Sequence, residues 1–420
     1  MSNFDSLLRD GKLGEYFTSE YVVLKHETGI HLAIMKIESI FKPDLTNEID
    51  KVYGGIRDGK IDINHPYVKI LMDYEKEGLI YCIGGEIVVG YDVPHYDFKE
   101  LRNSPLKLKQ KFKEDGWIDE NGNYLVNIVG FQTRNPLHKS HFQLTKYALD
   151  EATKLNGKKS KLLLHPVVGV TQTCDIDYHA RVKCYKELIK NYDSDEVILS
   201  LLPLSMRMAG PREVLWHAII RKNYGVSHFI VGRDHAGPSS NRSNGNRFYG
   251  LYDAQNNLQR YADKIGIIPI VSKMIVFSME KQKVYHLCAK YNGKQISEIS
   301  DSDIKKLDFM CKLQEKDGSF KSVEHINPES EVYFEISGTQ QRKLLSENKP
   351  IPSWFSYPEI ILLLRREFER PNGIVFYLIG LSGSGKSTIA NHLMTSIKEY
   401  TFRSITYLDG DIIRLNISKG

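Results

Sequence analysis

The sequence lacks the features that mark secreted and membrane-spanning proteins. Its five cysteines (Cys82, Cys174, Cys184, Cys288 and Cys311) are an odd, scattered set without a CxxC pair. This pattern excludes a disulfide framework and indicates a reducing, intracellular compartment. No apolar run approaches the roughly 18 residues that span a bilayer, and the longest, IVFYLIGL, covers 374–381. The N-terminus is acidic in places and has no apolar segment, so we predict no signal peptide and a cytoplasmic protein.

A strong charge of either sign is also missing. The 57 Lys and Arg against 52 Asp and Glu leave a net charge of +5, too small to predict a nucleic-acid or membrane partner. Small anionic substrates fit this balance equally well. The scattered cysteines have no ligand partners at zinc spacing, so we predict no metal site. With 420 residues, 41% of them hydrophobic, the chain is long enough for two to four folded domains.

The chain changes character along its length, which predicts four sections. Residues 1–97 read as a small β-rich domain, with strands near 20–25, 31–37 and 85–91 and helices over 45–53 and 66–78. In 98–325, the apolar runs NYLVNIVGF, KLLLHPVVG, EVILSLLPL and SHFIVG alternate with amphipathic stretches. This alternation predicts an α/β fold with a parallel sheet covered on both faces. A small section, 326–371, and a strand–glycine loop–helix, 372–420, follow.

The loop QTRNPLHKSH, 132–141, follows the first of these apolar strands. Asn135, followed by proline, predicts a helix start there, and a helix start exposes N–H groups that bind anions. His138 and His141 would share one face of its first turn. Arg134 can donate two hydrogen bonds to an oxyanion. The plain alternative is that the two histidines are surface or core residues without a ligand.

Two more loops follow apolar strands. GRDHAGP, 232–238, offers glycine for close approach of the backbone, Arg233 for charge, and His235 for a hydrogen bond to a phosphate. SMRMAGPRE, 205–213, contributes further arginines that could clamp an anion. In each case the plain alternative is a turn whose arginines pair with surface carboxylates. Because ligands of parallel sheets bind at the carboxyl ends of the strands, these loops after the strands are the candidate binding sites.

These loops contain no serine or cysteine in an activating context, which argues against an acyl-enzyme mechanism. Their glutamine, arginines and histidines suit transfer of a nucleotidyl or phosphoryl group, where catalysis is mostly positioning and stabilisation of charge.

The segments QTRNPLHKSH, MRMAGPREVLWHAIIRKNYG, FIVGRDHAGP and ISGTQQRKLL resemble, in the same order, the signature blocks of the ATP sulfurylase family. The resemblance extends over about residues 25–370. It implies an α/β, Rossmann-like nucleotidyltransferase domain behind a β-rich, PUA-like N-terminal domain that is shortened here. It also implies the reaction of sulfate with MgATP to give adenylyl sulfate and pyrophosphate, with Mg²⁺ entering with ATP, in a homo-oligomer.

The resemblance further implies the roles of individual residues. It assigns sulfate binding to Gln132, Arg134 and Ala236. It assigns catalysis to Thr133, Arg134, Asn135, His138 and His141, with the two histidines supporting the pyrophosphate. It assigns ATP binding to Gln132, Asn135, Gly232, Arg233, Asp234, His235 and Met274. The sequence differs at Gln172, where the family often has lysine, and at Val271 and Met274, where it usually has phenylalanine and a small apolar residue.

The segment GLSGSGKST matches the phosphate-binding loop G-x-x-x-x-G-K-[ST], between an expected strand IVFYLI and a helix TIANHLMTSIKE. We expect phosphate contacts from Gly380, Gly383, Gly385, Lys386, Ser387 and Thr388; a purely structural loop is the alternative. YLDGDIIR, 407–414, resembles the second signature of adenylylsulfate kinase, which implies that Asp411 and Arg414 contact adenylyl sulfate. We interpret 372–420 as the start of a truncated kinase domain, without kinase activity as it stands.

Three functions therefore remain open. The first is a sulfate adenylyltransferase. The second is a bifunctional sulfurylase–kinase of which this chain is a fragment. The third is a sulfurylase whose C-terminal piece is a regulatory nucleotide-binding module.

The two phosphate-binding regions predict separable activities. Replacing Lys386 with alanine removes the cation of the C-terminal loop but leaves the 132–141 and 232–238 loops intact. We expect Lys386→Ala to form adenylyl sulfate at the wild-type rate, measured as sulfate-dependent release of pyrophosphate. A large loss would show that the two regions are coupled.

Overall fold

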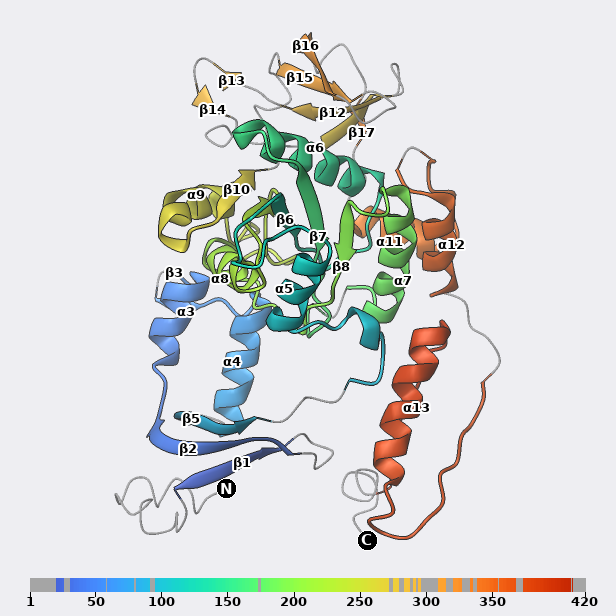
Figure 1. The fold of residues 1–420 in the computed structure, drawn as a ribbon. Helices are drawn as coiled ribbons and strands as arrows, with labels where there is room; N and C mark the ends of the chain where they lie inside the picture. Colours follow the sequence, from blue (N-terminus) through green and yellow to red (C-terminus); the bar gives the residue numbers. More distant parts are fainter. Residues whose placement is uncertain are drawn as a thin grey trace. The chain divides into compact units, whose positions relative to one another are not determined.

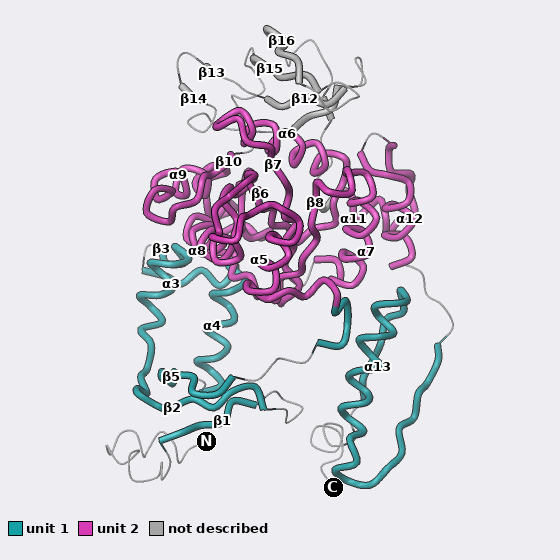
Figure 2. Tube along the Cα trace, in the orientation of Figure 1, with its two compact units in different colours: residues 1–99, 372–420 teal, residues 100–371 magenta. Residues whose placement is uncertain are grey.

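The computed structural model describes residues 20–410, with gaps at 26–30, 58, 79–80, 91–94, 173–174, 272–274, 279–282, 288–289, 292–293, 296–308, 315–319, 327–332, 335–337, 354, 368–372 and 409. The chain divides into two compact units (Figure 2). One comprises residues 1–99 and 372–420, and the other comprises residues 100–371.

The N-terminal part of the first unit is the expected small β-rich fold (Figure 1). An antiparallel sheet has the order β1-β2-β5 and contains β1 (Tyr21–Lys25), β2 (His31–Phe41) and β5 (Cys82–Gly90). The short strands β3 (Ile56–Arg57) and β4 (Lys60–Ile61) pair with each other. Both expected helices form, as α3 (Leu45–Tyr53) and α4 (Pro66–Lys76). The side chains of Asp44 and His65 cap them, accepting from Asn47 N at 3.0 Å and Tyr67 N at 3.3 Å.

The C-terminal part of the same unit confirms one expected element and not the other. The helix after the glycine loop is α13 (Lys386–Tyr400). The expected strand over IVFYLI is wrong, because residues 373–380 form no strand. Among the described strands none pairs with this stretch, so its backbone finds no ladder partner. Its apolar side chains remain exposed, with Val375 89% and Tyr377 84% accessible.

The second unit is built on the expected parallel sheet, whose order is β10-β9-β6-β7-β8. Its strands are β6 (Asn127–Phe131), β7 (Ser160–Leu164), β8 (Val197–Leu199), β9 (His228–Val231) and β10 (Ile268–Val271). Every pairing between them is parallel. The chain runs outward from β6 to β8 and then returns to the other side of β6 through β9. The sheet is therefore doubly wound, with its topological switch point between β6 and β9, where ligands of such sheets bind.

Helices alternate with these strands: α5 (Pro105–Glu114), α6 (Lys139–Asn156), α7 (Tyr178–Leu188), α8 (Gly210–Asn223) and α9 (Asp253–Ile265), with 3-10 turns at Lys99–Leu101 and Ile189–Asn191. Since parallel crossovers are right-handed, reversing the winding direction at β6 places α6 and α7 on one face and α8 and α9 on the other. The strands β6, β7 and β9 are buried along their whole length, which explains why their sequences are continuous apolar runs.

An antiparallel sheet follows the parallel one and has the order β16-β15-β12-β11-β17. Its strands are β11 (Ile275–Ser278), β12 (Lys283–Leu287), β15 (Phe309–Gln314), β16 (Phe320–Ile326) and β17 (Tyr333–Phe334), and β13 (Lys290–Tyr291) pairs separately with β14 (Lys294–Gln295). This sheet includes residues on both sides of the boundary expected at 325/326. Helices α11 (Gly338–Ser346) and α12 (Pro358–Arg366) complete the unit, and α12 packs on α7. No helix among the described residues is long and apolar enough to cross a membrane.

Leu163, in β7, is fully buried in the core of the second unit, whereas Leu155, in α6, is 61% exposed. We expect Leu163→Ala to lower the free energy of unfolding by about 2–5 kcal/mol, through lost burial and the cavity left behind. Leu155→Ala is the matched control and should change it by less than about 0.5 kcal/mol. All three tryptophans (Trp117, Trp216 and Trp354) lie in this unit, so urea unfolding followed by tryptophan fluorescence reports on it. Equal losses in the two variants would contradict the assigned core.

Candidate active site

The loop between β6 and α6 contains the densest group of expected site residues. The helix begins three residues later than predicted, because α6 starts at Lys139 with His138 as its N-cap. The prediction from Asn135 is therefore wrong. Thr133 Oγ1 exchanges hydrogen bonds with the backbone N and O of Asn135, each at 3.1 Å, and the hydroxyl of Tyr185 donates to the same carbonyl at 2.8 Å. These bonds hold residues 133–135 in a turn of their own before the helix begins.

The expected pairing of His138 and His141 is confirmed. Their ring centroids are 5.4 Å apart, and the backbone N of His138 donates to His141 Nδ1 at 3.2 Å. The His138 ring also contacts Phe355, centroid to centroid 4.3 Å, and hydrogen-bonds with Gln341 of α11. Gln341 belongs to the ISGTQQRKLL block and is 2% exposed. The sequence identified that block without indicating that it would reach His138.

Burial decides the charge of this histidine pair. It lowers the pKa of His141 to about 4. It also lowers the pKa of His138 well below the usual range, with a further contribution from neighbouring His141 and an opposing one from the bond with Gln341. Both rings are therefore neutral at pH 7. Since His141 Nδ1 accepts a hydrogen bond, its single proton is on Nε2, which makes this ring a neutral donor.

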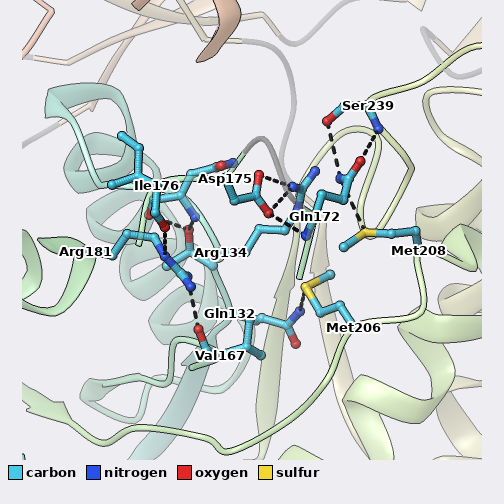
Figure 3. A network of polar contacts seen from close by, with 12 residues as sticks. Gln132, Arg134, Val167, Gln172, Asp175, Ile176, Arg181, Met206, Met208 and Ser239 are labelled. Carbon is cyan, nitrogen blue, oxygen red and sulfur yellow. Dashed lines mark hydrogen bonds and ion pairs between the residues drawn. The ribbon is translucent and has the colours of Figure 1, made fainter. Parts of the chain in front are cut away.

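Arg134 is held by Asp175, which no motif in the sequence marks. Its Nη1 donates to both carboxylate oxygens of Asp175, at 2.6 and 2.7 Å (Figure 3). The Arg134 side chain is 15% exposed and that of Asp175 is 3% exposed. Among the described residues the Nε and Nη2 of Arg134 have no partner. The guanidinium thus has one end fixed and further donors left for an oxyanion.

Gln132, the residue that follows β6, also has unused hydrogen-bonding capacity. It is 8% exposed, and its Oε1 is buried without a partner in the described part of the chain. Its Nε2 points at the sulfur of Met206, 3.8 Å away, which is a weak acceptor (Figure 3). A buried side-chain amide with so little bonding is a place where a ligand is expected.

The loop after β7 is anchored by a buried arginine. Arg181, 2% exposed, donates from Nε to the carbonyl of Ile176 at 2.9 Å and from Nη1 to that of Val167 at 3.0 Å (Figure 3). Within the loop, the backbone N of Gln172 donates to Asp175 at 3.2 Å. The Gln172 side chain donates to Ser239 Oγ at 3.3 Å and accepts from Ser239 N at 3.0 Å. In this chain Gln172 therefore joins the loop after β7 to the loop after β9.

The GRDHAGP loop follows β9, on the other side of the switch point from β7. Asp234 and Ala236 adopt positive φ angles of 54° and 56°, which non-glycine residues seldom do. The backbone N of Asp234 donates to the carbonyl of Leu251 at 2.7 Å. A Cβ on Gly237 would lie 2.1 Å from Asp234 Oδ1, so any other residue there would displace the Asp234 carboxylate. Asp234 also lies 3.5 Å from the guanidinium of Arg247.

The two arginines of the SMRMAGPRE loop lie at the surface of the second unit. Arg207 is exposed and lies over the ring of Trp216, 5.6 Å from its centroid, and Arg212 is also exposed. The loop is held by Glu213, which accepts from Arg207 N and Ala209 N, both at 2.9 Å.

The C-terminal glycine loop leads directly into a helix, as its motif predicts. Gly383 and Gly385 have φ angles of 76° and 84°, and α13 starts directly after Gly385. Lys386 folds back over the loop, donating from Nζ to the carbonyls of Gly380 and Leu381 at 2.9 and 2.7 Å. Ser387 and Thr388 are the next two residues of α13. The expected ligand contacts Met274, Asp411 and Arg414 lie outside the described residues.

The doubly wound sheet, with arginine-, histidine- and glycine-rich loops at its switch point, defines an α/β protein of the nucleotide-binding class. Comparison with protein families makes this specific, since the ATP-sulfurylase model matches residues 99–367. The chain belongs to the ATP-sulfurylase family. The PUA-like domain matches residues 10–90 and adenylylsulphate kinase matches 372–420, in agreement with the fold expected from the sequence.

Curated relatives agree with this family. The chain is 38% identical over 389 residues to a sulfate adenylyltransferase of Yarrowia lipolytica and 38% identical over 391 residues to one of Coccidioides immitis. Each match covers 92% of this chain and 57% of the relative, so the chain spans little more than half their length. Among solved structures, a hexameric APS kinase from Thiobacillus denitrificans has a similar fold, with a TM-score of 0.52 and 24% identity over 94% of this chain and 60% of that one.

Neutral buried histidines make stability depend on pH. His141 titrates with a pKa of about 4 in the folded chain and about 6.5 when unfolded. Between these values unfolding takes up a proton at this site, so stability falls as the pH falls. We expect His141→Gln to reduce the slope of the unfolding free energy against pH by up to ~1.4 kcal/mol per pH unit in this window. Tryptophan-monitored urea unfolding at several pH values measures it, and an unchanged slope would contradict a His141 whose pKa is lowered in the folded chain.

Proposed function

We propose that the protein is a sulfate adenylyltransferase, which transfers the adenylyl group of MgATP to sulfate and releases pyrophosphate. The observation that carries the proposal is the Arg134 guanidinium, beside the switch point. Asp175 fixes it through Nη1 at 2.6 and 2.7 Å, and Nε and Nη2 have no partner in the described part of the chain. A fixed, mostly buried cation with free donors suits a small oxyanion such as sulfate.

The roles in binding sulfate, binding ATP and catalysis are assigned to the residues named from the sequence. Gln132, Arg134 and Ala236 would bind sulfate. Gln132, Asn135, Gly232, Arg233, Asp234, His235 and Met274 would bind ATP, with Mg²⁺ entering as part of the substrate. Thr133, Arg134, Asn135, His138 and His141 would form the catalytic group. The assignment of the ATP loops is supported by their place after β6 and β9, on the two sides of the switch point.

The proposed step needs no covalent intermediate. A sulfate oxygen attacks the α-phosphorus, a new phosphorus–oxygen bond forms, and the bond to the bridging oxygen breaks as pyrophosphate leaves. Negative charge builds up on the departing pyrophosphate. The neutral donor Nε2–H of His141 and the first turn of α6 would stabilise that charge, and His138 is placed beside them. Positioning and charge stabilisation together account for the catalysis.

A second function is favoured by one observation. The intact glycine loop, with Gly383 and Gly385 at positive φ and Lys386 folded over it, supports nucleotide binding by residues 380–388. A bifunctional sulfurylase–kinase, or a sulfurylase with a regulatory module, would use such a site. Release of ADP from ATP in the presence of adenylyl sulfate would support the kinase, whereas ATP binding without turnover would support regulation. A homo-oligomer and a cytoplasmic location remain predictions.

The decisive assay is pyrophosphate release from MgATP by the 420-residue chain, with and without sulfate. We expect sulfate-dependent release, and we expect His138→Ala to lower kcat by about 10²-fold, the scale of loss when one group beside the developing negative charge is removed. Ser140→Ala is the matched control, since the side-chain hydroxyl of Ser140, two residues along in α6, has no hydrogen-bond partner among the described residues. It should retain wild-type kcat. Wild-type kcat in His138→Ala would show that the site at the start of α6 is misassigned, and no release from the folded wild-type chain would overturn the proposed function.

A further inference from the structure

Three side chains form a line of polar contacts from the interior of α8 to the GRDHAGP loop. The Nε2 of His235 lies 3.0 Å from Nδ1 of His217, and the Nε2 of His217 lies 3.2 Å from Oε1 of Glu213. The side chain of His217 is fully buried and that of Glu213 is 1% exposed, whereas His235 is half-buried. Glu213 and His217 are one turn apart in α8, so the helix fixes their spacing.

The protonation of this line follows from its surroundings. Each carboxylate oxygen of Glu213 accepts a backbone N–H, from Arg207 and from Ala209, which favours the ionised form although burial raises its pKa. The positive charge of buried Arg221 also favours the ionised form of Glu213. Burial lowers the pKa of His217 well below its usual range and that of His235 to about 3. At pH 7 each ring is therefore neutral and has one proton.

The positions of those two protons are then determined. His217 Nε2 and Glu213 Oε1 are 3.2 Å apart without hydrogen-bond geometry, but the negative charge of the carboxylate still favours a proton on this nitrogen over a lone pair, so we place the proton of His217 on Nε2. Its Nδ1 is bare and can only accept a hydrogen bond. The neighbouring His235 must accordingly donate from Nε2. This leaves His235 with a lone pair on Nδ1 and no proton for any other partner.

We propose that Glu213 and His217 are positioning residues that hold His235 in the Nε2–H form, so that His235 accepts a hydrogen bond from the nucleoside of the bound nucleotide. The donor would be an amino group of the base or a hydroxyl of the ribose. A phosphate oxygen is an acceptor and cannot serve, so this role differs from the phosphate contact expected from the sequence. The identity of the ligand as a nucleotide rests on the proposed function, whereas the proton positions do not.

The proton positions can be read in the free protein. In the full chain labelled with ¹⁵N-histidine, two-dimensional ¹H–¹⁵N spectra distinguish the two neutral forms, and His235→Gln assigns the His235 signals. We expect Nε2–H in the wild type and a shift of the His235 signals toward the other form in His217→Phe. His228, whose Nδ1 lies 2.9 Å from Ser227 Oγ, is the internal control and should not change. A wild-type His235 protonated at Nδ1 would overturn the proposal.

Binding of nucleotide analogues tests the ligand. Titrations of the wild type with ATP, ITP, 2′-deoxy-ATP and 3′-deoxy-ATP should show about a tenfold or greater loss of affinity for the analogue that lacks the donor, because an unsatisfied buried acceptor is costly. The analogue affected identifies base or ribose. In His235→Ala this difference should disappear.

Inorganic triphosphate provides the opposite test. If His235→Ala weakens triphosphate as much as ATP, His235 binds phosphate and the proposal is wrong. If ATP does not bind to the wild type, the proposed function is wrong, and the proposed contact between His235 and the nucleoside is wrong as well. The spectrum of the free protein still decides the Glu213–His217–His235 arrangement in that case.

Discussion

The ion pair between Arg134 and Asp175 is the contact on which the arrangement of the site depends. It joins the loop after β6 to the loop after β7. Asp175 holds its position because Arg181 anchors the backbone on either side of it, and Gln172 extends the connection to Ser239 beyond β9. These bonds join three loops that are separate in sequence. A fixed guanidinium matters where catalysis works by placing charge, since a mobile one would stabilise a transition state poorly.

Much of this architecture could be predicted from local sequence. Apolar runs of strand length between amphipathic stretches indicated the parallel sheet, and the structure has its strands where those runs lie. The spacing of His138 and His141 indicated that they would meet at the start of a helix, and they do, with His138 as the N-cap and His141 in the first turn of α6. These predictions succeeded because periodicity, burial and short-range spacing all point to the same structure.

The failures have physical causes that local sequence does not contain. Asn135 and the proline after it are a standard helix start, but Thr133 and Tyr185 bind the Asn135 backbone and delay the helix to Lys139. Asp175, Gln341 and His217 act through contacts with residues distant in sequence, so no motif marked them. A signal for two of them was present, since Gln341 and His217 lie in the blocks ISGTQQRKLL and MRMAGPREVLWHAIIRKNYG, whose polar residues stand among apolar ones.

The exposed stretch that contains Val375 and Tyr377 has a consequence for the behaviour of this chain in solution. It combines strong β propensity and no charge with a backbone that pairs with none of the described strands, which are features of segments that stack into intermolecular sheets. Copies of the chain could adhere through this stretch without any contact at the parallel sheet. A particle size measured at one concentration would then not distinguish such adhesion from a symmetric assembly. Adhesion through this stretch would give a series of sizes that grows with concentration, whereas closed symmetry yields one defined stoichiometry.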